Sequence, residues 1–359
     1  MNDTAPMKTP LKTPVTVLTG YLGAGKTTLL NRILSEDHGK KYAVIVNEFG
    51  EVGIDNDLIV GADEEVFEMN NGCVCCTVRG DLIRVVSGLM KRQSASGKGG
   101  FDAIVIETTG LADPGPVAQT FFVDEDVRAK TELDSVTAVV DAKHLPLRLA
   151  DSKEAAEQVA FADQIILNKT DLVTAAELAD VERLIRRLNP LAPIHRAQRS
   201  NVPLDQVLGR GSFDLGRIEE LEPDFLNPAH GEPGHVHDED CDHGHDGHDH
   251  HGHDHHHDIE ASGIRGISLT AHKPLSANKV TVWLNEVLQV QGPDILRAKG
   301  ILDVAGEDRR LVFQAVHMIL EGDFQGPWRD GAARYSRLVF IGRNLDEAKL
   351  REGFEACVA

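Results

Sequence analysis

A glycine-rich segment, residues 20–27, combines residue types and a spacing that predict phosphate chemistry. Its sequence Gly-Tyr-Leu-Gly-Ala-Gly-Lys-Thr fits the pattern G-x-x-x-x-G-K-[ST], between an apolar β-branched run and a helix-like stretch. Glycines let backbone N–H groups turn inward around phosphate oxygens, and the helix start adds partial positive charge. Lys26 is expected to reach the β- and γ-phosphates, and Thr27 to hold Mg²⁺. The predicted phosphate-binding residues are Gly20, Gly23, Ala24, Gly25, Lys26, Thr27 and Thr28.

A second motif, Asn168-Lys169-Thr170-Asp171, has the form N-K-x-D and follows a short apolar run. An aspartate carboxylate can accept two hydrogen bonds from guanine N1–H and the 2-amino group, a pair that adenine does not offer. Asp171 therefore predicts a guanine nucleotide. Asn168 is expected to help orient the base and the Lys169 stem to cover its face. A helix cap at Asp171 is the alternative.

An acidic strand end, Glu107-Thr108-Thr109-Gly110, follows the apolar run 103–107. In phosphate-loop proteins an acid at this place assists Mg²⁺. Gly110 would let a backbone N–H approach the γ-phosphate. We therefore predict Glu107 and Gly110, together with Lys26 and Thr27, as the catalytic residues. An ordinary strand-end acid is the alternative for Glu107.

A cysteine cluster places Cys73, Cys75 and Cys76 within four positions. Three thiols at this density can converge on one soft metal ion, and thiolates prefer Zn²⁺ or Cu(I). A fourth ligand must come from elsewhere, or a position stays open, which suits a site that hands its metal on. Buried structural cysteines or a redox pair are the alternatives.

Two further groups are weaker metal candidates on residue types alone. The segment 47–55, which includes Glu51, follows the second apolar run, where nucleotide switches hold a mobile loop. Its acids could meet Mg²⁺, water or a cysteine-bound metal, but a solvated acidic loop is the simpler interpretation. His144 stands alone after a strand-like run, and a lone histidine in that place usually has no such role.

A histidine-rich tract, residues 235–258, contains 11 of the 17 histidines, eight acids and no Lys or Arg. It has almost nothing apolar to bury, so it predicts a mobile linker. Neutral imidazoles bind Zn, Ni, Co and Cu, and the carboxylates attract cations. We expect metal collection here, by residues such as His243, His245, His248 and His250; a solvating linker or a tag-like scar is the alternative.

Elements that could position these motifs alternate along the first half of the chain. Short apolar runs closed by a polar residue are typical of strands buried on both faces, and helix-length periodic stretches separate them. The runs are 15–19, 43–47, 103–107, 136–141 and 164–168; predicted helices begin at Lys26 and cover 81–90 and 175–188. This order predicts a mostly parallel sheet with helices on both faces, and ligands at the carboxyl ends of its strands.

The tract divides the 359-residue chain into three predicted parts: a nucleotide-binding domain at 1–220, a linker at 221–260 and a second domain at 261–359. The second domain reads as a small α/β unit with strands at 264–269, 310–318 and 336–341 and helices at 279–290 and 345–355. It contains no catalytic cluster, and Trp283 and Trp328 are expected in its core.

Charge and composition exclude several functions. The formal net charge of −20 argues against a nucleic-acid surface, and no run approaches the roughly 18 apolar residues of a membrane span. The polar N-terminus has no apolar signal region. Five cysteines, three of them crowded together, make a poor disulfide framework and suit a reducing cytoplasm.

Taken together, the motifs resemble the CobW-type metal-handling P-loop GTPases of the CobW/HypB/UreG superfamily. The matching segments are TGYLGAGKTTLL (19–30), VNEFGEVGID (46–55), NGCVCC (71–76), ETTG (107–110) and NKTD (168–171). The resemblance implies a P-loop GTPase domain followed by a smaller C-terminal α/β domain. It also implies that this second domain serves client binding or self-association, the latter giving a homo-oligomer. It also implies that Glu51 and His144 lie near the metal.

The resemblance further implies a metallochaperone that hydrolyses GTP and delivers a metal, most often Zn²⁺, from the C-x-C-C motif to a client metalloprotein. GTP and Mg²⁺ are the expected ligands of the nucleotide site. Two rivals stay open at this point. One is a GTPase that inserts Co²⁺ or Ni²⁺, for example in cobalamin synthesis, and the other is a non-enzymatic zinc buffer.

Overall fold

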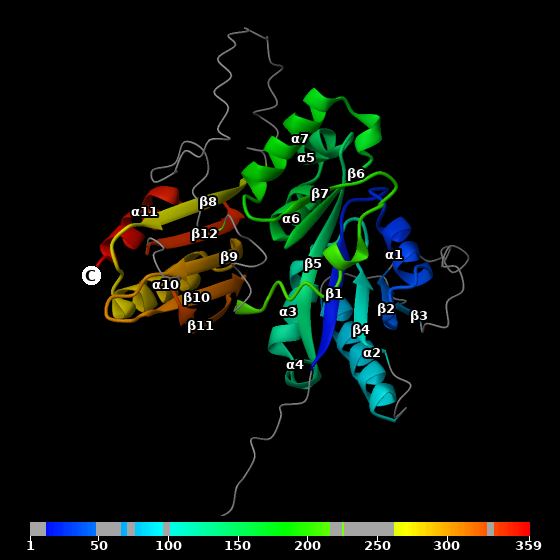
Figure 1. Ribbon diagram of the computed structural model, residues 1–359, viewed down its shortest axis with the longest axis horizontal. Helices are drawn as coiled ribbons and strands as arrows, with labels where there is room; N and C mark the ends of the chain where they lie inside the picture. Colours follow the sequence, from blue (N-terminus) through cyan, green and yellow to red (C-terminus); the bar gives the residue numbers. More distant parts are fainter. Residues whose placement is uncertain are drawn as a thin grey trace, which may run out of the picture.

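The computed structural model describes residues 12–47, 66–69, 76–95, 101–215, 225, 262–328 and 334–359. These residues form two sheets, one in each half of the chain, which lie side by side (Figure 1). The Glu51 segment, Cys73, Cys75 and the histidine tract fall outside the described residues, and so does the side chain of Cys76.

The first sheet has seven strands in the order β3-β2-β4-β1-β5-β6-β7, and all of its pairings are parallel. The strands are β1 (Thr13–Thr19), β2 (Tyr42–Asn47), β3 (Val66–Met69), β4 (Ala103–Glu107), β5 (Thr131–Asp141), β6 (Gln164–Asn168) and β7 (Ile194–Arg196). Its helices are α1 (Lys26–Ser35), α2 (Cys76–Ala95), α3 (Gly115–Val123), α4 (Glu125–Lys130), α5 (Leu145–Asp151), α6 (Lys153–Phe161) and α7 (Ala175–Leu188), with short 3₁₀ turns at Thr170–Leu172 and Leu204–Gln206.

Helices cover both faces of this sheet, as the continuous apolar runs predict. Helix α1 and the segment 197–208 pack on one face, and α2, α3, α6 and α7 pack on the other. Strands β4 and β6 are buried at every residue. Local signals fix the helix starts, for example at α7, where Thr174 and Glu177 form a reciprocal capping box.

The second sheet has five strands in the order β11-β10-β9-β12-β8, and all of its pairings are antiparallel. The strands are β8 (Ile264–Ala271), β9 (Ile295–Leu302), β10 (Arg309–Val316), β11 (Ile319–Pro327) and β12 (Ser336–Arg343). The helices are α10 (Ala277–Gln291) and α11 (Glu347–Ala356). Trp283 and Trp328 are buried, as predicted.

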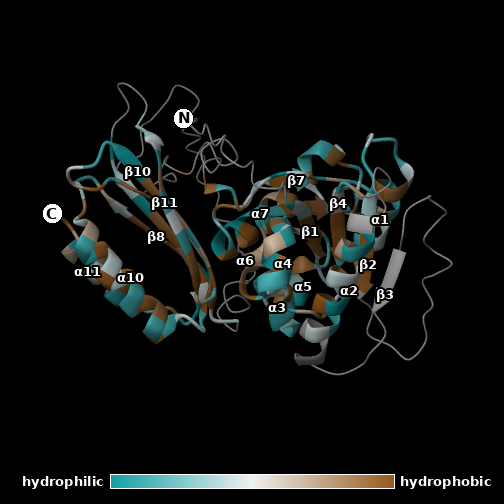
Figure 2. Ribbon diagram, turned by 90° about the horizontal axis from the view of Figure 1, so that it is seen from below, coloured by the Kyte–Doolittle hydropathy of each residue, from teal (hydrophilic) through white to brown (hydrophobic). Residues whose placement is uncertain are grey.

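Both faces of the antiparallel sheet are buried. Phe313, Leu338 and Phe340 belong to the core under α10 and α11, which lie on the side of the sheet away from the first domain (Figure 2). Alternate residues such as Val312 and Val339 join the core of the first domain instead. Helix α6 is the main contact, because it touches β8, β9 and β12.

The expected strands and helices are confirmed, and several elements were not foreseen. Strands β9 and β11 were not predicted, and together with the three predicted strands they form the continuous antiparallel sheet of the second domain. Helices α3 to α6 and the edge strands β3 and β7 also went unpredicted. No helix among the described residues is long and apolar enough to cross a membrane.

Candidate functional site

The glycine-rich segment forms a tight loop between β1 and α1. Gly20 and Gly25 have φ values of 137° and 114°, which L side chains rarely adopt. A Cβ atom on Gly20 would overlap the Val139 carbonyl, and one on Gly25 would overlap the Asn168 amide. Glycine is therefore required at both positions, and the loop can present N–H groups rather than side chains to a ligand.

Lys26 and Thr27 open helix α1 beside Glu107 at the end of β4. Lys26 Nζ donates hydrogen bonds to the carbonyls of Gly20 at 2.7 Å and Tyr21 at 3.4 Å. Burial lowers the pKa of Lys26, and the Glu107 carboxylate opposes that change. Thr27 Oγ1 donates to Glu107 Oε1 at 3.1 Å. A hydroxyl and a carboxylate oxygen side by side fit Mg²⁺, which prefers hard oxygen ligands.

The loop after β4 runs against the phosphate loop. Thr108 N donates to the Leu18 carbonyl at 2.9 Å, which ties the loop to β1. Gly110 approaches Leu22 so closely that a Cβ atom would lie 2.6 Å from Leu22 N. The backbone at Gly110 therefore packs against the glycine-rich loop, and the role of its N–H at a γ-phosphate stays a prediction.

Asn168, at the end of β6, is tied to the phosphate loop. Its Nδ2 donates to the Ala24 carbonyl at 2.8 Å, and its Oδ1 accepts from Ser200 N at 2.8 Å. Ser200 Oγ in turn donates to the Gly25 carbonyl at 2.9 Å. The N-K-x-D motif thus lies directly beside the glycine-rich loop, and Asp171 is exposed next to it.

Lys169, Asp141 and His144 form a polar row on the other side of the loop. Lys169 Nζ donates to Asp141 Oδ2 at 2.7 Å, and His144 Nδ1 lies 2.9 Å from the same oxygen. Burial acts to raise the pKa of Asp141, but the hydrogen bonds from Lys169 and His144 outweigh it and lower the pKa. The ionised Asp141 therefore holds Lys169, whose backbone is left-handed with φ of 61°.

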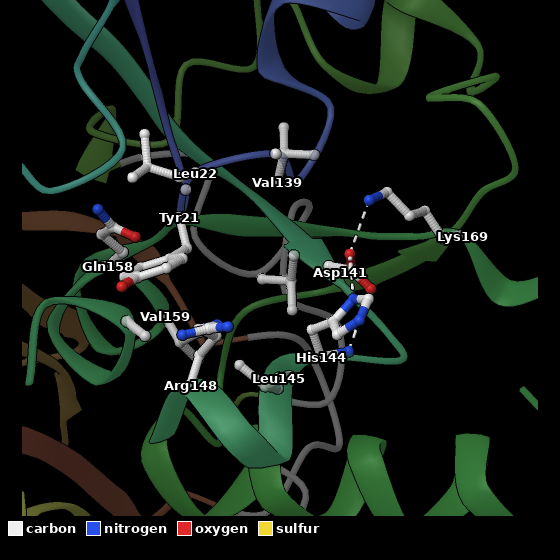
Figure 3. A pocket seen from close by; sticks show the side chains of 14 residues that line it. Tyr21, Leu22, Val139, Asp141, His144, Leu145, Arg148, Gln158, Val159 and Lys169 are labelled. Atoms are coloured by element: carbon white, nitrogen blue, oxygen red, sulfur yellow. Dashed lines mark hydrogen bonds and ion pairs between the residues drawn. The ribbon is translucent and has the colours of Figure 1, made fainter. Parts of the chain in front are cut away.

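A cavity of about 250 Å³ adjoins this row, as Figure 3 shows. The phosphate loop forms one wall, through Tyr21 and Leu22, and helices α5 and α6 form another, through Arg148 and Gln158. The Arg148 guanidinium lies 5.3 Å from the centre of the Tyr21 ring. The cavity lies beside the phosphate loop and shares Gly23 and Lys169 with the predicted nucleotide site.

Most of the predicted metal ligands lie outside the described residues. Cys76 is the first residue of α2, and Cys73 and Cys75 come shortly before it in the sequence. His144 immediately precedes α5, and its Nδ1 lies 2.9 Å from Asp141 Oδ2. Within the described part of the chain, no three His, Cys, Asp or Glu residues gather as a metal site. The assignments of Cys73, Cys75, Cys76, Glu51, His144 and the tract histidines therefore stay predictions.

Sequence reasoning missed three residues that build the site: Ser200, Asp141 and Gln158. Ser200 follows a strand of only three residues, β7, which gives little periodic signal. Asp141 ends a predicted strand, and that position was the available clue. Gln158 lies inside α6, and its contacts are 46 and 48 residues away in the sequence, so no local pattern reveals it.

The parallel sheet, the glycine-rich loop and the adjoining N-K-x-D motif define a P-loop nucleotide-binding protein with a GTPase fold. A family model described as "CobW/HypB/UreG, nucleotide-binding domain" matches residues 14–196. A second, described as "Cobalamin synthesis protein cobW C-terminal domain", matches residues 264–358. The chain belongs to the CobW/HypB/UreG family.

Curated relatives match along nearly the whole chain. The zinc chaperone YjiA of Escherichia coli K12 is 35% identical over 341 residues, covering 95% of this chain and 97% of YjiA. The zinc chaperone CobW of Pseudomonas aeruginosa PAO1 is 36% identical, with 99% and 94% covered. The crystal structure of Zn(II)-bound YjiA GTPase from E. coli superposes with a TM-score of 0.73 at 31% identity, covering 97% of this chain and all of that one.

Proposed function

We propose that the chain is a Mg²⁺-dependent GTPase and metallochaperone that binds Zn²⁺ and transfers it to a client metalloprotein. The observation that carries the nucleotide half is the 2.8 Å hydrogen bond from Asn168 to the Ala24 carbonyl, which joins the predicted base site to the phosphate loop. Two relatives that align over nearly the whole chain are named zinc chaperones, which supports the metal half.

In this proposal, Lys26 and the loop N–H groups bind the phosphates, and Thr27 and Glu107 hold Mg²⁺, which neutralises phosphate charge. Gly110 brings a backbone N–H to the γ-phosphate. Asp171 selects guanine, and Asp141 keeps the Lys169 stem in place for the base. The residues Gly20, Gly23, Ala24, Gly25 and Thr28 complete the predicted nucleotide site.

Zn²⁺ is the cargo in this proposal, and Cys73, Cys75 and Cys76 are its predicted ligands. The place of Cys76 at the first residue of α2 supports the assignment, because a helix N-terminus favours the thiolate form that binds metal. The histidine tract collects the metal, and hydrolysis of GTP weakens the cysteine site toward release. The reduced thiols that this requires suit a cytoplasmic location.

Zinc affinity measured with a non-hydrolysable GTP analogue and with GDP tests the coupling. We expect the two affinities to differ by about tenfold, within the range of ordinary coupling free energies. A Cys73→Ser, Cys75→Ser, Cys76→Ser variant should lose the tight site, whereas Cys357→Ser, which changes a buried thiol of the second domain, should keep it. Equal zinc affinities in both nucleotide states would refute the coupling.

Metal competition separates the proposal from its rivals. The wild-type chain and the two cysteine variants are each given Zn²⁺, Co²⁺ and Ni²⁺ together. The bound metal is then measured with the GTP analogue present. Preference for Co²⁺ or Ni²⁺ over Zn²⁺ that is lost in the triple cysteine variant would indicate an inserter of those metals, because thiolate ligands otherwise select Zn²⁺ among these three. If neither added metal nor the Lys26→Ala substitution changes the rate of GTP hydrolysis, the chain would be a non-enzymatic zinc buffer.

A further inference from the structure

Gln158 of helix α6 binds the main chain of the loop that follows β4. Its side chain is buried, with 1% of the residue exposed. Its Nε2 donates to the carbonyls of Gly110 and Ala112, each at 3.1 Å. Both amide hydrogens are therefore used, and the amide cannot be flipped without placing its oxygen against two carbonyl oxygens.

The remaining atom of this amide faces the cavity beside the phosphate loop. Gln158 Oε1 has no hydrogen-bond partner among the described residues, and in Figure 3 it points toward Tyr21. Leaving a buried acceptor without a partner costs free energy. The glutamine is therefore poorly explained as a packing residue, and its role is better assigned to the two carbonyls that it holds.

We propose that Gln158 is a positioning residue of the nucleotide site, which fixes Gly110 against the phosphate loop so that its N–H is directed at the γ-phosphate. The loop is fixed at its start by the Thr108 bond to β1 and at 110–112 by Gln158. This inference deepens the proposed function and rests on it, because it requires that a guanosine triphosphate occupies the loop.

The same helix is held by the second domain. Arg343 of β12 donates to Glu157 Oε1 through Nε at 3.2 Å and Nη2 at 2.7 Å. Arg297 of β9 donates to the Phe161 carbonyl at 3.1 Å. Glu157 is the immediate neighbour of Gln158, so a displacement of the antiparallel sheet relative to the first domain moves the residue that positions Gly110.

The second domain also touches the far end of the same loop. His317 lies so close to Gly115 that a Cβ atom there would contact its Nε2 at 2.5 Å, and its ring lies 5.8 Å from that of Phe161. The loop from Thr108 to Gly115 is thus held between α6 and the second domain. We infer that the position of the second domain affects γ-phosphate recognition through Glu157 and Gln158.

The test compares two buried glutamines that differ in their partners. Gln158→Met removes both bonds to the loop at nearly constant volume. Gln164→Met is the matched control, because Gln164 is also buried, and its Nε2 donates to Thr137 Oγ1 at 2.8 Å and the Val207 carbonyl at 2.9 Å, away from the loop. The readout is the ratio of affinities for a fluorescent non-hydrolysable GTP analogue and for GDP.

We expect Gln158→Met to lower this ratio by about tenfold, and kcat for GTP by 10- to 100-fold, because small misplacements of a catalytic group have effects of that size. GDP affinity should stay within about twofold of the wild type, since GDP lacks the γ-phosphate. Gln164→Met should leave the ratio unchanged. An equal ratio in wild type and Gln158→Met, or equal losses in both variants, would overturn the inference.

A second pair of variants tests the link to the second domain without altering a buried glutamine. Arg343→Met removes the contact to Glu157 and should lower the ratio severalfold, whereas Arg265→Met removes an ion pair to Glu347 within the second domain and should not. An unchanged ratio in Arg343→Met would overturn this link. A wild-type chain that binds no guanine nucleotide would instead refute the proposed function itself.

Discussion

The two sheets of the molecule use their side chains in opposite ways. The parallel sheet places the polar residues of its candidate site at the carboxyl ends of its strands, where Glu107, Asp141 and Asn168 each end a strand. The antiparallel sheet carries charged residues in mid-strand, among them Arg297 and Lys299, and buries them against the first domain. The difference indicates that the first sheet binds ligands at the carboxyl ends of its strands, whereas the second sheet uses one face to pack against the first domain.

The largest effect should come from breaking the chemistry of the strand ends. Lys26→Ala should reduce GTP hydrolysis at least about 100-fold, because a preorganised charge on the phosphates is worth that much. The fold should be retained, since burial already lowers the pKa of Lys26. Hydrolysis rates and melting curves of wild type and variant provide the measurement. A large loss of stability would show that Lys26 is a structural residue.

The next largest effect should come from removing a buried charge at the interface between the antiparallel sheet and the first domain. Asp163 is buried between the sheets, where it pairs with Arg297 and lies 3.8 Å from Lys299 Nζ. Asp163→Asn leaves those cations with less countercharge and should lower the free energy of unfolding by about 3 kcal/mol. Urea denaturation provides the measurement. A loss below about 1 kcal/mol would mean that the face docks by apolar contact alone.

The interface should also respond to pH. Burial lowers the pKa of His317, Arg343 lowers it further, and Asp113 opposes them. As the pH falls below about 6.5, His317 therefore takes up a proton in the unfolded chain before it does so in the folded protein. The contribution of His317 to the free energy of unfolding decreases over this range, until the histidine also titrates in the folded protein. His317→Asn, which suits the left-handed backbone at φ 51°, should show a shallower loss.

Stability curves of both proteins between pH 7.5 and pH 5 would measure this. Equal slopes for wild type and variant would mean that His317 does not titrate differently in the two states. Asp113 and Arg343 both act on the pKa of His317, and Arg343 also donates to Glu157, so the slope that remains in the variant comes from groups other than His317.

The smallest effect should come from an exposed pair at the same interface. Arg128 Nη2 of α4 lies 3.8 Å from Glu321 Oε1 of β11, and both side chains are exposed to solvent. Glu321→Gln should change the free energy of unfolding by less than about 0.5 kcal/mol, because exposed pairs are screened by water. It serves as the matched control for Asp163→Asn in the same denaturation series.

The sequence predicted most of the first sheet and of the nucleotide site because those signals are local. An apolar run followed by Gly-x-x-x-x-Gly-Lys-Thr needs only eight residues to be recognised. Strand β9 went unpredicted because Arg297 and Lys299 interrupt its apolar pattern, and their countercharge, Asp163, lies far away in the chain. Strand β11 contains Gly322, Gly326 and Pro327, which usually indicate a turn.

The parts of the site that escaped prediction depend on long-range contacts. Ser200 contacts Gly25 across 175 positions, and Gln158 contacts Gly110 across 48. A serine in a loop and a glutamine in a helix are ordinary in their own surroundings. Only the parallel order of the strands brings them to the phosphate loop, so their roles follow from the topology rather than from any motif.

The ends of both sheets bear on the solubility of the protein. Strand β7, which closes one edge of the parallel sheet, has only three residues. Strand β11, one edge of the other sheet, carries Glu321 and Asp323 and ends in Pro327. Short, charged or proline-terminated edges are poor templates for pairing with another chain. We therefore expect folded molecules to resist pairing through these two edges even when highly concentrated.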